Sequence, residues 1–88
     1  MEYKAALTKN FLRELKNLPE NVKERILKAI DEILVSPFLG IKLRGELEGL
    51  WRWRVGKYRI VYKINRESRL VIFLDVGIRK KFTSDFMF

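Results

Sequence analysis

The first half of the chain places its apolar residues with the period of helices. Phe11, Leu15 and Leu18 recur four and three residues apart, which puts them on one helical face. Thr8 comes just before this stretch and is a typical N-cap residue. Pro19 suits the first turn of a second helix, and Ser36-Pro37 ends it. The apolar stripe of that helix consists of Val22, Ile26, Ala29, Ile30, Ile33 and Leu34. The pattern therefore predicts a helical hairpin.

After Pro37 the pattern changes to the period of strands. Residues 38–49 contain three glycines and are predicted to form a loop that leads into a strand. Residues 50–55 and 58–64 alternate around Gly56-Lys57, where glycine comes first, as in a type II′ hairpin turn. A polar loop then precedes residues 70–76, which are nearly all apolar, as in an interior strand. Residues 2–7 predict one more short strand.

These elements predict an α+β fold. The helical hairpin packs on one face of a small antiparallel β-sheet of three strands, and residues 2–7 can join the sheet edge. With 88 residues and no repeat or linker, the chain is expected to form a single domain over residues 1–88.

A two-residue turn at Gly56-Lys57 fixes which side chains share a face of the hairpin. Arg54 is then directly opposite Arg59, because side chains alternate between faces with period two. The face toward the helices is predicted to carry Trp51, Trp53, Val55, Tyr58, Ile60, Tyr62 and Ile64. The opposite face is predicted to carry Arg52, Arg54, Arg59, Val61 and Lys63.

The third strand is placed by assuming that its hairpin is symmetric about Glu67. Leu70, Ile72, Leu74 and Val76 then face the helices, whereas Val71, Phe73 and Asp75 join the arginines. In this register Asp75 lies opposite Arg59 and can neutralise it, and neither Arg59 nor Arg79 belongs to the core. Arg79, just beyond the strand, can join the arginine face.

The positive charge is concentrated in the second half of the chain. The net charge is +8, yet residues 1–37 hold seven basic and six acidic residues, against twelve and four in residues 38–81. A one-sided basic field is typical of a protein that binds a polyanion, either nucleic acid or an acidic protein. Plain solubility explains a scattered excess of charge better than a segregated one.

Two interpretations fit the arginines. They are either solvated side chains on an exposed sheet face, or a binding site for an anion. Like charges directly opposite each other destabilise a sheet by up to about 1 kcal/mol per pair. The planar guanidinium also suits phosphate better than an ammonium group does, which favours the binding site.

Cysteine and histidine are both absent, which excludes several kinds of site. Without cysteine there is no disulfide and no thiolate metal site, and without histidine the commonest metal ligand and general base are missing. The N-terminus has no apolar segment typical of a secretory signal, and no apolar run approaches the length of a membrane span. We therefore expect a cytoplasmic protein.

Roughly residues 3–82, the helical hairpin included, resemble the RelE/ParE superfamily of toxins from toxin–antitoxin systems, and within it RelE most. The resemblance rests on K-L-x-G-x-L-x-G-x-W-R-x-R at 42–54, G-x-Y-R-I-x-Y at 56–62 and V-G-x-R at 76–79. RelE-type toxins bind the ribosomal A site and cut mRNA without a metal or other cofactor, through attack of the ribose 2′-hydroxyl on its own phosphate. ParE-type toxins share the fold but inhibit DNA gyrase. In both types an antitoxin blocks the toxin.

The resemblance implies roles for four arginines. Arg59 and Arg79 match the residues that hold the phosphate and stabilise its extra negative charge in RelE-type enzymes. Arg52 and Arg54 match two lysines of the RelE pattern, one of which is a candidate general base. The basic residues expected to bind RNA around them are Lys42, Arg44, Lys57, Lys63, Lys80 and Lys81.

The chain departs from the RelE pattern in its acid–base groups. Arginine holds its charge well but exchanges protons poorly, because its pKa exceeds about 12. The tail carries Phe82, Phe86 and Phe88 where the family often has a tyrosine or histidine. Lys57, Lys80 and Lys81, or else Glu46 and Glu48, are the remaining candidates for proton transfer.

The tail also has alternative interpretations. Phe82, Phe86, Met87 and Phe88 can cover Val61, Val71 and Phe73 on the sheet, stack on bases, or bind the antitoxin. The antitoxin itself is expected to be acidic, amphipathic and partly disordered when free.

Three functions remain open at this point. The first is a RelE-like, metal-free, ribosome-dependent mRNA endoribonuclease that inhibits translation. The second is a ParE-like inhibitor of DNA gyrase. The third is a basic RNA- or protein-binding module with weak or no catalysis.

Overall fold

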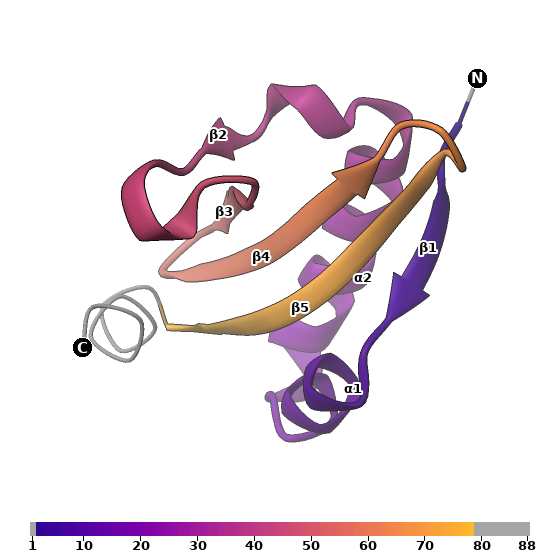
Figure 1. The fold of residues 1–88 in the computed structure, drawn as a ribbon. Helices are drawn as coiled ribbons and strands as arrows, with labels where there is room; N and C mark the ends of the chain where they lie inside the picture. The colour runs from indigo at the N-terminus through magenta and orange to yellow at the C-terminus, as the bar shows by residue number, and fades with distance from the viewer. Residues whose placement is uncertain (1, 79–88) are drawn as a thin grey trace.

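The computed structural model describes residues 2–78, and Figure 1 shows the order of its helices and strands. They are β1 (Lys4–Leu7), α1 (Lys9–Lys16), α2 (Glu20–Val35), the 3₁₀ helix η1 (Pro37–Leu39), β2 (Ile41–Lys42), the 3₁₀ helix η2 (Gly45–Leu47), β3 (Trp51–Val55), β4 (Tyr58–Asn65) and β5 (Leu70–Ile78). Two helices thus precede the β3–β4–β5 meander, as predicted.

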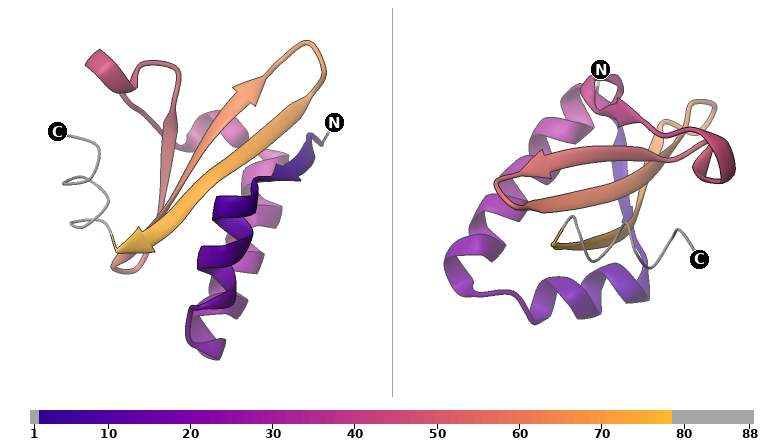
Figure 2. Two further views of the ribbon diagram at one scale, coloured as in Figure 1. Left: turned by 60° about the horizontal axis from the view of Figure 1, so that its bottom comes forward. Right: turned by 90° about the vertical axis from the view of Figure 1, so that its left-hand side faces the viewer.

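The five strands form one sheet in the order β1-β5-β4-β3-β2. The strands β2 to β5 pair antiparallel, whereas β1 lies parallel to β5 at the sheet edge. Both α-helices lie on the same side of the sheet, and the segment with β2 and η2 projects on the other side (Figures 1 and 2). The prediction of an α+β fold with a helical hairpin is confirmed, with a mixed rather than wholly antiparallel sheet.

Thr8 starts α1 and also ties it to the sheet. Its hydroxyl oxygen accepts a hydrogen bond from the Phe11 backbone N–H at 3.1 Å, which confirms the predicted N-cap. The same hydroxyl donates to the Phe73 carbonyl oxygen at 3.0 Å. One side chain therefore fixes both the first turn of α1 and its position against β5.

The core lies between the helices and one face of the sheet. The side chains of α1 and α2 that were predicted to form apolar stripes pack on residues from β4 and β5. The buried cluster consists of Phe11, Leu15, Val22, Ile26, Ala29, Ile30, Ile33, Ile60, Tyr62, Val71, Phe73 and Val76. Trp51, Trp53 and Val55 of β3 are only partly buried against it. The predicted face of β3 and β4 is thus correct.

The β3–β4 hairpin has the predicted register. Val55 pairs with Tyr58 and Arg54 with Arg59, so Gly56 and Lys57 form the turn. The backbone φ of Gly56 is 62°, the left-handed value that a type II′ turn requires at its first position. A side chain there would also approach the Arg25 guanidinium to 2.7 Å.

The predicted register of β5 is wrong at its start. Asn65 pairs with Leu70 and Tyr62 with Phe73, so the loop holds four residues and is not symmetric about Glu67. Arg69, at φ 54°, closes this loop. A shift of one residue exchanges the two faces of a strand. Val71 and Phe73 therefore lie in the core, whereas Leu70 and Ile72 do not.

A bulge then restores the predicted face at the end of β5. The register shifts between Val61 and Tyr62, so that Val61 pairs with Asp75 and Leu74 is passed over. Val76 pairs with Ile60 and is buried, as predicted. Arg59 pairs with Gly77 and not with Asp75, which corrects the predicted partner of Arg59.

Tyr62 anchors the chain that enters β2. Its hydroxyl is buried and donates to the Pro37 carbonyl oxygen at 2.8 Å. Burial raises the pKa of Tyr62 above its ordinary value, so the hydroxyl stays a donor at neutral pH. Gly40 leaves room for this hydroxyl, since a Cβ on Gly40 would collide with it and lie 2.9 Å from the Arg52 carbonyl oxygen.

We expect Gly40→Ala to lower the free energy of unfolding by about 1–3 kcal/mol, because the added methyl group overpacks a buried site. Urea unfolding measures the change. Gly77→Ala is the matched control, since a Cβ on Gly77 meets nothing within 4 Å. Equal stabilities of the two variants would show that the Tyr62 side chain moves to accommodate the added methyl group without a loss of stability.

Candidate functional site

The sheet face opposite the helices carries a group of cations that we call the arginine face: Arg52, Arg54, Arg59 and Lys63. Arg54 on β3 lies directly opposite Arg59 on β4, and Arg52 lies opposite Val61. Arg54 and Lys63 are exposed, and Arg52 is half-buried. The structure thus brings together four of the predicted site residues on two neighbouring strands.

Arg59 differs from its neighbours in being buried. Its side chain is 1% exposed, so the expectation that it lies outside the packed interior is wrong. Arg59 lies on the central strand β4, between β3 and β5, and its partner on β5 is a glycine. A buried cation acts on its surroundings more strongly than an exposed one, because water and salt screen it less.

The other cations of the arginine face, Arg52, Arg54 and Lys63, form no ion pair among the described residues. The Arg52 Nε atom is also buried without a hydrogen-bond acceptor among these residues. Opposed like charges destabilise the sheet, so the arginine face gains stability when an anion binds.

Further cations border the arginine face on the side of β2. Lys42 lies on β2 and Arg44 follows it, and both are exposed. With Leu43, Gly45 and Glu48 they line a cavity of about 360 Å³. The segment projects away from the helices (Figure 2), which extends the basic surface beyond the edge of the sheet. Lys57, in the β3–β4 turn, is exposed at the other end of β3.

Several predicted positions lie outside the described residues. They are Arg79, Lys80, Lys81, Phe82, Phe86, Met87 and Phe88. The predicted cover over the sheet by the tail therefore stays a prediction, although Val71 and Phe73 no longer need one, because they lie in the core.

Asp75 pairs with Val61 on the strand beside the arginines, and its carboxylate also contacts α1, where Asn10 Nδ2 donates to Asp75 Oδ1 at 3.4 Å. Where β1 ends, α1 takes its place beside β5, and Asn10 donates to the Leu74 carbonyl oxygen at 2.9 Å. The Val76 N–H donates to Asp75 Oδ1 at 2.9 Å and to Glu14 Oε1 at 3.3 Å, so two carboxylates share one donor. Burial, with Glu14 adding to it, raises the pKa of Asp75 to about 7. The sequence could not show this pair, because its members are far apart in the chain.

The raised pKa makes stability depend on pH. Because folding raises the pKa of Asp75 from 3.8 to about 7, the native state keeps a proton that the unfolded chain releases. The contribution of protonated Asp75 to the free energy of unfolding is therefore complete below about pH 4 and is lost as the pH rises to about 7. We expect Asp75→Asn to remove this loss, so that the variant exceeds the wild type in stability at pH 7.5 more than at pH 4.

Urea unfolding of both proteins across this range measures the difference. Glu67→Gln is the control, since Glu67 is exposed in the β4–β5 loop and should show no such trend. A difference between Asp75→Asn and the wild type that stays constant with pH would contradict the shared-donor geometry.

Chemically, the arginine face can bind a polyanion and stabilise negative charge that develops on it. No group of three or more potential metal ligands (His, Cys, Asp or Glu) is close enough to hold a metal ion within the described part of the chain. None of the described helices is long and apolar enough to cross a membrane.

Comparison with known proteins gives a family match over most of the chain. Residues 5–81 match the family model described as the ParE toxin of the type II toxin–antitoxin system parDE. The chain is 38% identical over 79 residues to the toxin RelE of Mycobacterium tuberculosis, an alignment that covers 88% of this chain and 81% of the relative.

Solved structures agree with the sequence matches. A chain in the toxin–antitoxin complex RelBE2 of Mycobacterium tuberculosis superposes with a TM-score of 0.83 at 31% identity and covers 90% of this chain and 100% of that one. A chain in the archaeal RelE–RelB complex of Pyrococcus horikoshii OT3 gives a TM-score of 0.76 at 29% identity, covering 90% and 97%.

Proposed function

This chain belongs to the ParE/RelE toxin family of type II toxin–antitoxin systems, and we propose that it is a RelE-type toxin that cuts mRNA on the ribosome and so inhibits translation in the cytoplasm. The observation that carries the proposal is the arginine face. Arg54 and Arg59 lie directly opposite each other on the sheet face away from the helices. Such paired cations suit a phosphate that becomes more negative during the reaction.

The proposed reaction transfers a phosphoryl group within the RNA itself. The ribose 2′-oxygen bonds to the adjacent phosphorus and the bond to the 5′-oxygen breaks, which leaves a 2′,3′-cyclic phosphate. The hydroxyl proton leaves to solvent and the 5′-oxygen takes up a proton. Arg54 contacts the phosphate from the surface, with Arg52 assisting, while Arg59 adds charge from beneath. Arg79 is proposed as a further phosphate ligand from the end of β5.

The basic residues around this centre are proposed to hold the RNA strand. Phosphate contacts position a nucleic acid without reading its sequence. We propose that these phosphate contacts come from Lys42 and Arg44 on the β2 side and from Lys57 at the turn. Lys63 adds a contact along the arginine face, and Lys80 and Lys81 add contacts from the tail. Binding should therefore weaken steeply with salt.

Proton transfer is the weakest part of this machinery. The arginines cannot act as general bases, because their pKa exceeds about 12. Positioned acid–base groups contribute about 10²–10⁴-fold in rate, whereas one oxyanion donor contributes about 10²–10³-fold. We therefore propose slow cleavage that depends on groups of the ribosome, with Lys57, Lys80 or Lys81 as candidate proton carriers.

A second candidate, inhibition of DNA gyrase, is favoured by the family model that matches, since that model describes ParE toxins. A third, a basic binding module without catalysis, follows from the weak acid–base groups. In each case we propose that an acidic antitoxin, partly disordered when free, binds and blocks this chain.

Primer extension on an mRNA translated by purified ribosomes, together with a gyrase supercoiling assay, separates the three. Discrete cuts near the A site that require ribosomes support the proposal. Intact message with blocked supercoiling replaces it with the second candidate. If the message stays intact and supercoiling is not blocked, the third candidate, a binding module without catalysis, is supported.

A further inference from the structure

A cleft between the end of α2 and β3 lies apart from the arginine face. Its volume is about 510 Å³, which is within the usual range for sites that bind small molecules. The lining residues are Asp31, Glu32, Val35, Ser36, Leu39 and Trp53. The proposed cleavage of RNA uses none of these residues, so the cleft has no role in the function argued so far.

The apolar side chains of the cleft are unusually exposed. Val35 is 58% exposed and Leu39 76%, and both line the cleft together with Trp53. Large apolar side chains around a hollow leave water when a ligand fills it, which favours binding of an apolar group. The cleft therefore suits a ligand with an apolar or aromatic body.

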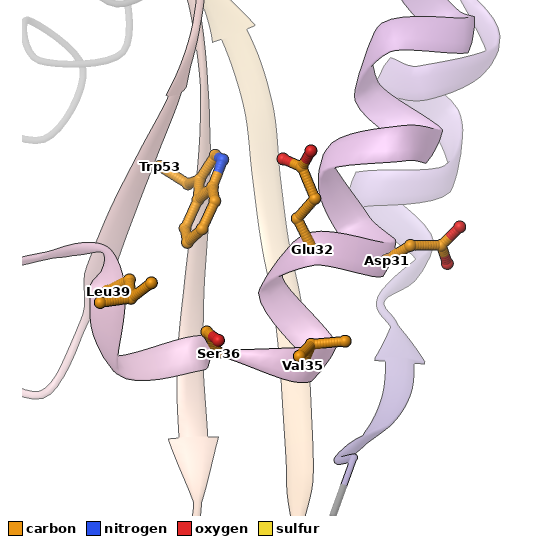
Figure 3. Close-up of a pocket in the computed structure, with 6 residues that line it drawn as sticks. All are labelled: Asp31, Glu32, Val35, Ser36, Leu39 and Trp53. Carbon is orange, nitrogen blue, oxygen red and sulfur yellow. The ribbon is translucent and has the colours of Figure 1, made fainter.

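The charge at the cleft is negative, although the chain as a whole carries +8. Figure 3 shows Glu32 extending from α2 toward Trp53, whereas Asp31 points away from Trp53. Within residues 2–78, neither carboxylate forms an ion pair, not even with Lys28, which lies one turn before Glu32 on α2. A positively charged ligand thus finds a carboxylate that no side chain of the described part of the chain neutralises.

The end of α2 adds to this negative charge. The last carbonyl groups of a helix carry partial negative charge, which favours nearby cations and disfavours carboxylates. α2 ends at Val35 without a basic residue in its last turn, and both Asp31 and Glu32 lie within its last five residues. A cation bound here relieves the repulsion between these like charges.

Trp53 supplies the remaining part of a cation site. The face of an indole ring attracts cations more strongly than the rings of tyrosine or phenylalanine do. Trp53 is half-buried against the core and also lines the cleft, so its ring is held in place and is still accessible to a ligand. An ammonium group between Glu32 and this ring contacts one full and one partial negative charge.

We propose that the cleft between α2 and β3 binds a small organic cation, with its apolar or aromatic body against Val35 and Leu39 and its ammonium group between Glu32 and Trp53. Anionic ligands are repelled at this cleft, in contrast to the arginine face. The inference does not depend on the proposed nuclease function, since no lining residue belongs to the arginine face.

NMR titration of the isotope-labelled protein tests the proposal, because the chain has two tryptophans and therefore two indole N–H signals. The probes are 2-phenylethylamine, which is protonated at neutral pH, and its uncharged counterpart 2-phenylethanol. We expect the amine to shift the Trp53 signal and to bind at least about fivefold tighter than the alcohol, through the ring and the carboxylate. The Trp51 signal is the internal control, since Trp51 packs on Phe38 and does not line the cleft.

Two variants separate this site from general attraction of cations. Glu32→Gln should remove the preference for the amine, whereas Glu24→Gln, also exposed on α2 but outside the cleft, should keep it. Equal affinities of amine and alcohol for the wild type would overturn the proposal, as would a preference that survives Glu32→Gln. A Trp53 signal that moves with protein concentration in the absence of a probe would also overturn it, since a second copy of the chain would then occupy the cleft.

Discussion

Replacement of Arg59 by methionine is expected to lower ribosome-dependent cleavage of mRNA by about 10²–10³-fold, the usual effect of losing one group that stabilises an oxyanion. Methionine keeps much of the volume and flexibility of the side chain and removes its charge and its N–H donors. Because Arg59 is 1% exposed, water and salt screen its charge less than that of a surface arginine.

The same variant should keep its fold. Methionine fills much of the same buried space, so the apolar packing around this position is largely kept. Circular dichroism and urea unfolding check that the variant is folded before its activity is compared. Arg66→Met is the matched control, because Arg66 lies in the β4–β5 loop, with its guanidinium 4.7 Å from the Phe38 ring centroid. Full activity of a folded Arg59→Met protein would show that Arg59 takes no part in cleavage.

Phe73→Ala is expected to cost about 3–5 kcal/mol in the free energy of unfolding, the range for a fully buried phenylalanine. Phe73 is 0% exposed, and its ring centroid lies 5.5 Å from that of Phe11 and 6.0 Å from that of Tyr62. The loss leaves a cavity between α1 and the sheet that these neighbours cannot fill.

Ile72→Ala is the control for this variant, since Ile72 is the neighbouring residue on β5 but lies outside the core cluster. Urea unfolding compares the two. A larger loss for Ile72→Ala than for Phe73→Ala would mean that the register of β5 is the symmetric one predicted from the sequence.

Phe73 also shows why the sequence predicted some strands correctly and one incorrectly. In β3 and β4 the polar and apolar residues alternate, so the pattern itself assigns the faces, and Gly56 fixes the turn. β5 is apolar almost throughout, so its pattern does not show which residues face the core. The length of the β4–β5 loop, which sets the register, decides this instead. The four-residue loop closed by Arg69 and the bulge at Leu74 each shift that assignment by one residue.

The site shows the same limit. The pairing of Arg54 with Arg59 follows from local alternation and was predictable. The burial of Arg59 depends on its place in the middle of the sheet. The carboxylate pair of Asp75 and Glu14 depends on α1 docking where β1 ends. There Glu14 accepts from Val76, 62 residues along the chain, and no local pattern encodes this contact.

The measurement that tests the central claim most directly uses a message with a single 2′-deoxynucleotide at the cut position, bound to purified ribosomes. If the arginine face only stabilises a phosphate that the neighbouring 2′-hydroxyl attacks, the all-ribose message is cut and leaves a 2′,3′-cyclic phosphate. The substituted message then stays intact at that position. Cleavage of the substituted message at the same bond would contradict this mechanism, because a nucleophile other than the 2′-hydroxyl would then attack the phosphorus.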